Sequence, residues 1–161
     1  MFLIHGHDEA KRRELKEILE TKLACRVVVM SEAPGKSRTL IEKLEEEAEP
    51  CNAGIAVLTP DDLVREKDAE YPQPRPNVLF ELGWFVGRLG RARTLLVVKN
   101  GTKIPSDLHG IEQLQFRQDV AEAFLRLEKE VGEWCRGRPQ PPEDLPSDER
   151  RHRPVGAIDN D

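Results

Sequence analysis

Short apolar runs alternate with amphipathic segments along the first 136 residues of the chain. A run that is apolar at every position is typical of a strand buried on both faces, whereas apolar residues spaced by three and four are typical of a helix with one buried face. The runs that we interpret as strands are residues 2–4, 26–30, 53–58, 94–99 and 113–116. The pattern therefore predicts a protein of the α/β class.

Helices are predicted in the segments between these strands. Asp8 is a good N-cap for a helix that reaches about residue 23, Thr39 opens a second helix, and Asn77 is a good N-cap for a third at residues 77–89. The residues expected to face the core are Leu15, Ile18, Leu19 and Leu23 in the first helix, Leu40, Ile41, Leu44 and Ala48 in the second, Val78, Leu82, Phe85, Val86 and Leu89 in the third, and Val120, Phe124, Leu127, Val131 and Trp134 in a last helix.

Buried strands separated by helices of about ten residues or more indicate a parallel sheet covered by helices on both faces. We therefore predict a flavodoxin-like three-layer sandwich with a five-stranded parallel sheet in the order 2-1-3-4-5. Residues 59–75 are polar and are expected to form a loop. After residue 136, prolines and charges replace the periodic pattern. The predicted domain is therefore 1–136, and residues 137–161 are expected to be a disordered tail or a linker.

Composition argues against several classes of protein. The chain has 161 residues and a net charge of −5, whereas a nucleic-acid-binding surface needs a concentrated basic patch. No apolar run approaches the roughly 20 residues of a membrane-spanning helix, and the N-terminal segment lacks the pattern of a signal peptide. Cys25, Cys51 and Cys135 are too few and too widely spaced for a disulfide framework. We expect a cytoplasmic protein that binds neither membranes nor nucleic-acid polymers.

The predicted topology indicates where a ligand binds. In an open parallel sheet, ligands bind beyond the carboxyl ends of the strands. Four segments should meet there, namely residues 5–8, 32–38, 59–62 and the first turn of the helix at 77–89. Glu81 is then expected at the rim of the pocket. A glutamate near a helix N-terminus also has a structural explanation, because the helix dipole favours it by roughly 0.3–1 kcal/mol.

Glu81 is the strongest candidate for a catalytic residue, because carboxylates are seldom placed beside a hydrophobic core without a reason. At helical spacings of three and four, Asn77, Glu81, Trp84 and Arg88 share one stripe of the helix. The candidate substrate-binding residues at the same rim are His5, Gly6, His7, Asp8, Lys36, Arg38, Asp61, Asn77 and Trp84.

Several of these candidates have simpler explanations. Lys36 and Arg38 fit a solvated loop equally well, Asp61 fits a helix cap, and Trp84 fits the core. Two histidines on either side of a glycine, as in residues 5–7, supply only half of a metal site, so no metal is expected.

Six sequence motifs occur in an order that resembles one known family. They are HGHD at residues 5–8, RTLIEK at 38–43, AVLTPDD at 56–62, RPNVLFELG at 75–83, GRLGR at 87–91 and PSDLHG at 105–110. Together they resemble the bacterial TIR-like domain of anti-phage effectors, a group that includes TIR–STING fusions and Pycsar TIR effectors. The resemblance covers residues 1–116 and implies a TIR-like fold.

The resemblance implies an enzyme. Similar TIR domains are NAD⁺ glycohydrolases, which cleave the bond between nicotinamide and ribose, and Glu81 occupies the motif position of their catalytic glutamate. NAD⁺ would be the substrate and no separate cofactor would be needed. The products would be nicotinamide and either ADP-ribose or its cyclic form. Replacing Glu81 by Gln is expected to abolish turnover and to leave thermal stability nearly unchanged.

The resemblance also implies activation by assembly. Residues 32–38 correspond to the BB loop, which rearranges when TIR domains form oligomers or filaments. A cyclic-nucleotide-sensing domain or partner is one candidate for the trigger, and the sequence does not name the activating signal. The chain would then be either the catalytic domain of a longer effector or a separate module with another trigger.

Two alternatives to an NAD⁺ hydrolase stay open. One is a TIR-type module that only self-associates for signalling. The other is a nucleoside deoxyribosyltransferase-like enzyme, which shares the layered fold and also uses a glutamate at this rim.

Overall fold

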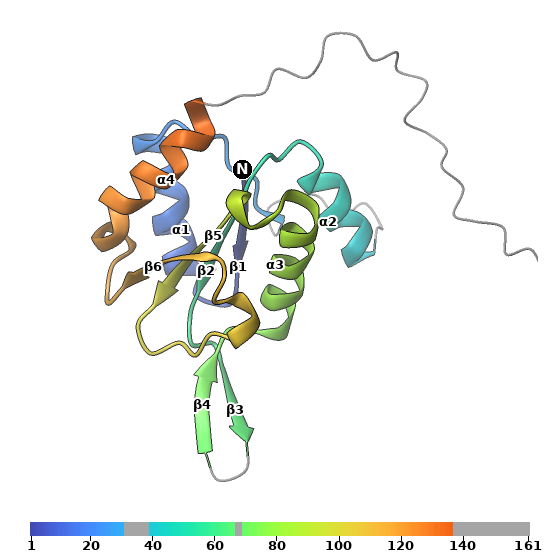
Figure 1. Cartoon of the computed structure of the whole chain (residues 1–161), viewed down its shortest axis with the longest axis vertical. Coiled ribbons are helices and arrows are strands. Elements are labelled where there is room, and N and C mark those ends of the chain that lie inside the picture. The colour runs from blue at the N-terminus through green and yellow to red at the C-terminus, as the bar shows by residue number, and fades with distance from the viewer. Residues whose placement is uncertain (31–38, 67–68, 137–161) are drawn as a thin grey trace, which may run out of the picture.

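A parallel sheet of four strands lies at the centre of the domain (Figure 1). The computed structural model describes residues 1–30, 39–66 and 69–136, so the loop predicted at 32–38 and the tail predicted at 137–161 lie outside the described residues. The strands follow the order β1 (Phe2–His5), β2 (Gly54–Leu58), β5 (Thr94–Lys99) and β6 (Glu112–Phe116). All three strand pairs are parallel, so the carboxyl ends of the four strands meet at one edge.

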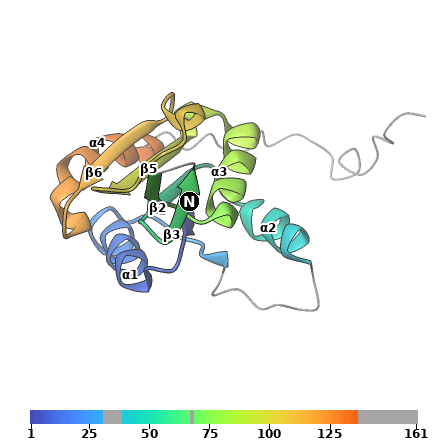
Figure 2. The same cartoon turned by 90° about the horizontal axis from the view of Figure 1, so that it is seen from below.

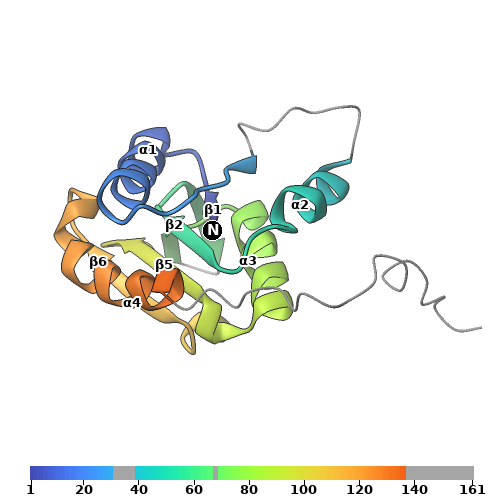
Figure 3. The same ribbon diagram turned by 90° about the horizontal axis from the view of Figure 1, so that it is seen from above.

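Helices cover both faces of this sheet (Figure 2, Figure 3). On one face lie α1 (Glu9–Glu17), its π-helical continuation η1 (Ile18–Lys22), the 3₁₀ turn η5 (Val120–Ala123) and α4 (Phe124–Arg136). On the other lie α2 (Leu40–Ala48) and α3 (Pro76–Leu89). Two further 3₁₀ turns, η3 (Arg91–Arg93) and η4 (Ser106–Leu108), precede β5 and β6. This arrangement confirms the predicted α/β sandwich with a parallel sheet.

Alternate residues of β1, β2 and β5 enter one of two hydrophobic cores. Leu3, Ile55 and Leu95 pack beneath α1 and α4, whereas Ile4 and Ala56 pack beneath α2 and α3. Successive side chains of a strand point to opposite faces, so a strand covered on both sides must be apolar at every position. This requirement explains why continuous apolar runs located β1, β2 and β5, whereas β6 is an edge strand in which only Leu114 and Phe116 are buried.

The helix that carries Glu81 is fixed to the sheet by a close contact. A Cβ atom on Gly54, at the start of β2, would lie 2.9 Å from Cδ1 of Phe85. The missing side chain of Gly54 therefore leaves the space in which the Phe85 ring sits. On its other side that ring packs against Phe2, with 4.8 Å between the ring centroids. Phe85 is fully buried and anchors α3 one turn beyond Glu81.

The fifth strand, predicted at residues 26–30, is reduced to one bridge at the edge of the sheet. Val28 pairs in parallel with Phe2 and makes two hydrogen bonds of 2.9 Å, from its N–H to the carbonyl of Met1 and from the N–H of Leu3 to its carbonyl. The segment lies beside β1, on the side where the predicted order places it. The prediction of a full strand was wrong, because an edge segment pairs on one side only and this one follows a backbone turn at Ala24, whose φ is 51°.

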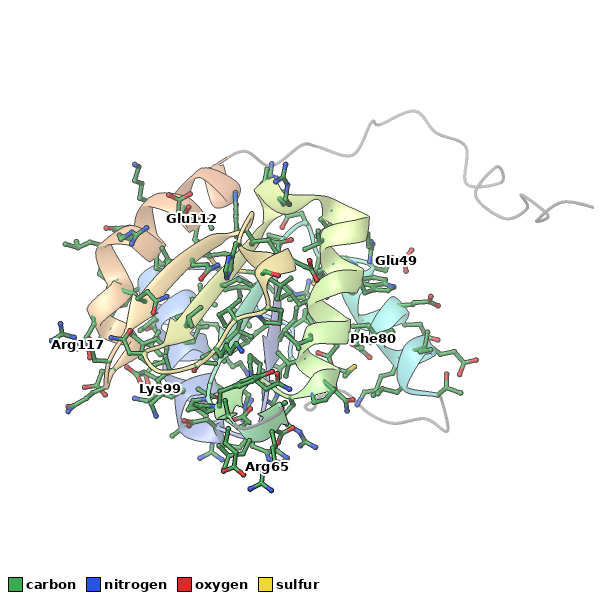
Figure 4. The ribbon with its side chains drawn as sticks, turned by 60° about the horizontal axis from the view of Figure 1, so that its bottom comes forward. Glu49, Arg65, Phe80, Lys99, Glu112 and Arg117 are labelled. Atoms are coloured by element: carbon green, nitrogen blue, oxygen red, sulfur yellow. The ribbon has the colours of Figure 1, made fainter. Side chains whose placement is uncertain are left out.

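The predicted loop at 59–75 instead contains a β-hairpin. Strands β3 (Asp62–Glu66) and β4 (Ala69–Gln73) pair antiparallel and project beyond the carboxyl edge of the sheet (Figure 1). Arg65, which extends from the hairpin in Figure 4, pairs with Glu70 at 2.9 Å. Leu63 is 75% exposed. The hairpin buries little apolar surface, so its strands lack the alternating pattern that would have predicted them.

The first turn of α2 faces away from the core. Leu40 and Ile41 are 53% and 52% exposed, in contrast to the prediction that both face inward. Only Leu44 and Ala48, in the later turns, reach the core. The predicted start is confirmed, because Thr39 caps the helix in a reciprocal arrangement with Glu42.

The N-caps of the other two helices differ in outcome. Asp8 caps α1 as predicted, since its Oδ1 accepts a hydrogen bond of 3.0 Å from the N–H of Lys11. Asn77 does not cap α3, because the helix begins at Pro76 and Arg75 is the N-cap. Proline is favoured at the first helical position because it has no N–H to leave unpaired there. Asn77 therefore lies inside the first turn.

Candidate active site

Glu81 is buried in the second turn of α3, with 9% of its surface exposed. Among the described residues its carboxyl has no hydrogen-bond or ion-pair partner. Burial raises the pKa of this carboxyl from 4.5 to about 7. The helix dipole does not oppose this effect strongly, because its influence falls off within the first turn. Glu81 is thus a carboxyl that titrates near neutral pH.

Glu81 lines a pocket with a volume of about 290 Å³ at the carboxyl edge of the sheet. The pocket lies between the end of β1, the first turn of α2 and the first two turns of α3. Its lining residues are Leu3, His5, Gly6, Met30, Leu40, Lys43, Arg75, Asn77, Val78 and Glu81. Apolar walls with a few polar groups among them are typical of small-molecule sites. The prediction that Glu81 lies at the rim of a pocket at this edge agrees with the structure.

The loop after β1 is held against the end of β2 by Asp61. Its Oδ2 accepts a hydrogen bond of 3.0 Å from the N–H of His7, and its Oδ1 accepts one of 2.8 Å from the hydroxyl of Thr59. A Cβ atom on Gly6 would lie 1.7 Å from Oδ2 of Asp61, so only glycine allows this approach. Asp61 thus shapes one wall of the pocket from behind and does not line it.

Two other candidates in this loop have structural partners. Asp8 caps α1 and also lies 3.7 Å from Nζ of Lys99 at the end of β5. His5 lines the pocket, and its Nδ1 lies 2.8 Å from the carbonyl oxygen of Gly6 and 3.9 Å from the carboxylate of Glu9. His5 and Gly6 are therefore part of the pocket surface, whereas Asp8 supports the loop.

Arg75 connects three segments around the pocket. It is the N-cap residue of α3, and its Nη1 contacts Nε2 of His7 in the loop after β1. Its Nε lies 4.0 Å from Oδ2 of Asp62, at the base of the hairpin. This Nε atom is buried and has no hydrogen bond. The guanidinium thus stands at the pocket wall with part of its donor capacity unused.

Lys43 brings a second cation to the same pocket. It lies at the start of α2, one turn after Thr39, and its side chain is partly buried. Sequence reasoning missed both Lys43 and Arg75. A signal was present, because a helix that leads into a parallel strand begins at the carboxyl edge of the sheet, where ligands bind. The first-turn residues of α2 and the N-cap of α3 could have been included on that ground.

The structure does not bring all of the candidate residues to the pocket. Asn77 lines it, but Trp84 lies farther along α3, where its ring packs edge-on against Phe85 at 5.0 Å and Arg88 stands 5.2 Å from its centroid. Trp84 therefore packs against the core and does not line this pocket. Lys36 and Arg38 lie outside the described residues.

Neither a metal centre nor a membrane span is found in the part of the chain that the structure describes. No three side chains from histidine, cysteine, aspartate or glutamate there are grouped to hold an ion. None of the helices described combines the length and apolar character needed to cross a bilayer. Cys25 and Cys51, the two cysteines whose side chains are described, are buried free thiols as predicted.

A three-layer fold with a buried glutamate at the carboxyl edge of its parallel sheet is the arrangement expected of a TIR-like domain. The family described as the TIR domain of CAP12/Pycsar effector proteins matches residues 1–118. The chain therefore belongs to this family, which is the bacterial anti-phage TIR class that its sequence motifs resemble.

Individual relatives agree with this assignment. The chain is 37% identical over 113 residues to the uncharacterized protein YuaY of Escherichia coli K12, a match that covers 69% of this chain and 38% of YuaY. It is 32% identical over 143 residues to protein tirC of Dictyostelium discoideum, covering 81% and 69% of the two chains. It is 44% identical over 91 residues to the Pycsar effector protein PaPycTIR of Pseudomonas aeruginosa, covering 55% and 30%. The match thus spans less than half the length of YuaY and of PaPycTIR.

Proposed function

We propose that this domain hydrolyses NAD⁺ at the bond between nicotinamide and ribose, with Glu81 as the catalytic residue. The observation that carries the proposal is a buried carboxyl on the wall of a pocket at the carboxyl edge of the sheet, without a partner among the described residues. Membership of the CAP12/Pycsar TIR family supports it, because the motifs of this chain resemble those of TIR NAD⁺ glycohydrolases.

The reaction needs only one carboxylate. When the glycosidic bond breaks, its electron pair stays with the nicotinamide nitrogen, and the pyridinium ring leaves as neutral nicotinamide. The ribose carbon becomes oxocarbenium-like, as in glycoside cleavage in general. Ionised Glu81 stabilises this positive charge. Water then adds to the carbon and releases a proton, which gives ADP-ribose. Attack by an adenine nitrogen in place of water would give the cyclic product.

The raised pKa of Glu81 suits a cationic substrate. Burial disfavours the ionised carboxylate in the empty pocket, whereas a pyridinium ion beside it favours ionisation. Substrate binding and ionisation of Glu81 therefore support each other. From the sequence, the helix N-terminus is expected to favour the ionised form of Glu81. Glu81 lies beyond the first turn of α3, so the bound pyridinium ion takes this role in the proposed reaction.

The size of the pocket fits part of a dinucleotide. A volume of about 290 Å³ is at the lower end of the range for ligand sites. We propose that it holds the nicotinamide riboside end, and that the diphosphate passes the rim toward the adenosine end outside. No separate cofactor is required by this scheme.

We further propose that the domain acts as a cytoplasmic anti-phage effector that is activated by self-assembly. Its family and its relative named Pycsar effector protein support this role. The proposed trigger is a cyclic-nucleotide-sensing domain or partner. Assembly into an oligomer or filament would complete the pocket with residues from neighbouring copies.

The proposal is tested by nicotinamide release from NAD⁺ at low and high protein concentration. Wild type is compared with Glu81→Gln and with Glu128→Gln, a matched change at an exposed position on α4. Release that rises steeply with concentration and is lost only in Glu81→Gln is the expected result. No release by concentrated or crowded wild type would contradict it and favour a self-association module. Release of bases from nucleosides would favour the deoxyribosyltransferase-like alternative.

A further inference from the structure

The pocket that contains Glu81 also contains two cations whose role the reaction above leaves open. We propose that Lys43 and Arg75 bind the diphosphate of the substrate and make the site selective for nicotinamide nucleotides over nicotinamide nucleosides. This inference rests on the proposed function of the same pocket. Both residues line the pocket, from α2 and from the N-cap of α3.

Lys43 is a cation without a counterion in the described part of the structure. Its side chain is partly buried, and its ammonium group has no hydrogen bond or ion pair to any residue described. A lysine in this setting gives up part of its hydration and gains no partner in return among the described residues. An anion in the pocket would supply the missing partner.

Arg75 has spare donor capacity at the same wall. Its Nη1 contacts His7, and Asp62 lies 4.0 Å from its Nε, which is farther than a hydrogen bond. The Nε atom is buried and has no hydrogen bond. A guanidinium presents its donors in a planar fork that fits two oxygens of a phosphate group. Nε itself is shielded from the pocket, so a phosphate at the rim would engage Nη2, which has no partner among the described residues.

The positions of the two cations add to the attraction for an anion. Lys43 lies one turn after Thr39, the N-cap of α2, and Arg75 is the N-cap of α3, so both cations lie near the amino end of a helix. Helix N-termini and nearby cations favour phosphate oxygens together. The two helices have 9 and 14 residues, and both N-termini face the same pocket.

The carboxyl of Glu81 is not paired with either cation. No ion pair within 4.0 Å joins Glu81 to Lys43 or Arg75. Burial raises the pKa of Glu81, and no nearby cation lowers it in return. The pocket thus offers an anionic group at one place and cationic groups at another. NAD⁺ has the complementary polarity, with a positive pyridinium ring on one side of the ribose and a negative diphosphate on the other.

The inference is tested by comparing NAD⁺, nicotinamide mononucleotide and nicotinamide riboside as substrates of the full chain. The first two carry phosphate next to the ribose, and the third does not. The variants are Lys43→Gln, Arg75→Gln and the double variant. Lys129→Gln and Arg13→Gln, at exposed positions of α4 and α1, are the matched controls. Lys43→Arg and Arg75→Lys keep the charge and should recover part of the effect.

Each single variant should reduce the ratio of kcat/KM for NAD⁺ to kcat/KM for nicotinamide riboside by about 10- to 100-fold, as expected for hydrogen bonds to charged groups. The loss should lie mainly in KM, should extend to the mononucleotide and should shrink at high salt. An unchanged ratio would overturn the inference, whether all substrates are affected equally or none is. The Lys43→Gln variant should fold normally, because Lys43 has no structural partner among the described residues. Misfolding would therefore not explain a loss of activity in this variant.

A binding measurement separates this inference from the proposed function. ADP-ribose carries the diphosphate but has no bond for the enzyme to cleave, so its affinity can be measured by calorimetry in the Glu81→Gln protein. Loss of affinity on adding Lys43→Gln or Arg75→Gln supports diphosphate binding even if wild type releases no nicotinamide. Unchanged ADP-ribose affinity in the double variant would refute diphosphate binding even if NAD⁺ is hydrolysed.

Discussion

Replacing Glu81 by Gln should stabilise the domain at neutral and alkaline pH, and this prediction replaces the sequence-based expectation that thermal stability stays nearly unchanged, because the structure shows the carboxyl to be buried. Burial raises the pKa of the folded-state carboxyl from its ordinary value of 4.5 to about 7. Below its ordinary pKa the carboxyl is protonated in both the folded and the unfolded chain, so it does not change the free energy of unfolding. Above about pH 7 it is ionised in both, and the folded state bears the full penalty of a buried charge. The stability of wild type therefore falls as pH rises through this window.

The size of the effect follows from the pKa. Each unit by which the folded-state pKa exceeds the unfolded one corresponds to about 1.4 kcal/mol. Ionised Glu81 thus reduces the free energy of unfolding by roughly 3 kcal/mol at alkaline pH. In a domain of this size that free energy corresponds to a change in Tm on the order of 10 °C. The neutral amide of Gln has nearly the shape of the protonated acid and avoids the penalty.

Thermal unfolding of both proteins between pH 4.5 and 9 provides the measurement. The Tm difference between Glu81→Gln and wild type should be near zero at the acidic end and should grow through pH 7, whereas Glu128→Gln should show no such growth. Equal Tm values at every pH, or a variant that is less stable above pH 7, would refute the reasoning. The kcat/KM of wild type for NAD⁺ should rise over the same pH range, because the free enzyme needs ionised Glu81.

Three further predictions concern other residues of the domain. Glu122 accepts hydrogen bonds from three backbone amides, which lowers the pKa of its carboxyl to about 2, so Glu122→Gln should reduce Tm at pH 7 and the difference should fade as pH drops below 4.5 toward 2. Gly54→Ala should destabilise the domain by roughly 1–3 kcal/mol in denaturant unfolding because its methyl group meets the Phe85 ring, and Phe85→Leu should relieve part of this loss. Gly6→Ala should lower both stability and kcat/KM by displacing Asp61, and the loss of stability should be smaller in an Asp61→Ala background if the clash is its cause.

Much of the fold could be predicted because the central strands are buried on both faces and must be apolar throughout. The position of Glu81 followed from topology, since the helix that carries it begins at the carboxyl edge of the sheet. The hairpin could not be found in the same way, because it lies off the core and Leu63 on β3 is exposed. The cations Lys43 and Arg75 were missed because charged residues in the first turns of helices are usually solvated. Which helix starts share a pocket depends on tertiary packing.

The contact between Gly54 and Phe85 has a consequence for regulation. The ring fills a gap at the amino end of β2, so α3 cannot slide along the sheet without driving Phe85 into a strand position that carries a side chain. Glu81 precedes Phe85 by one helical turn. Its position along the sheet is therefore fixed by a contact at the edge opposite the pocket. In the proposed activation by assembly, substrate contacts would be brought to an acid whose position is already fixed.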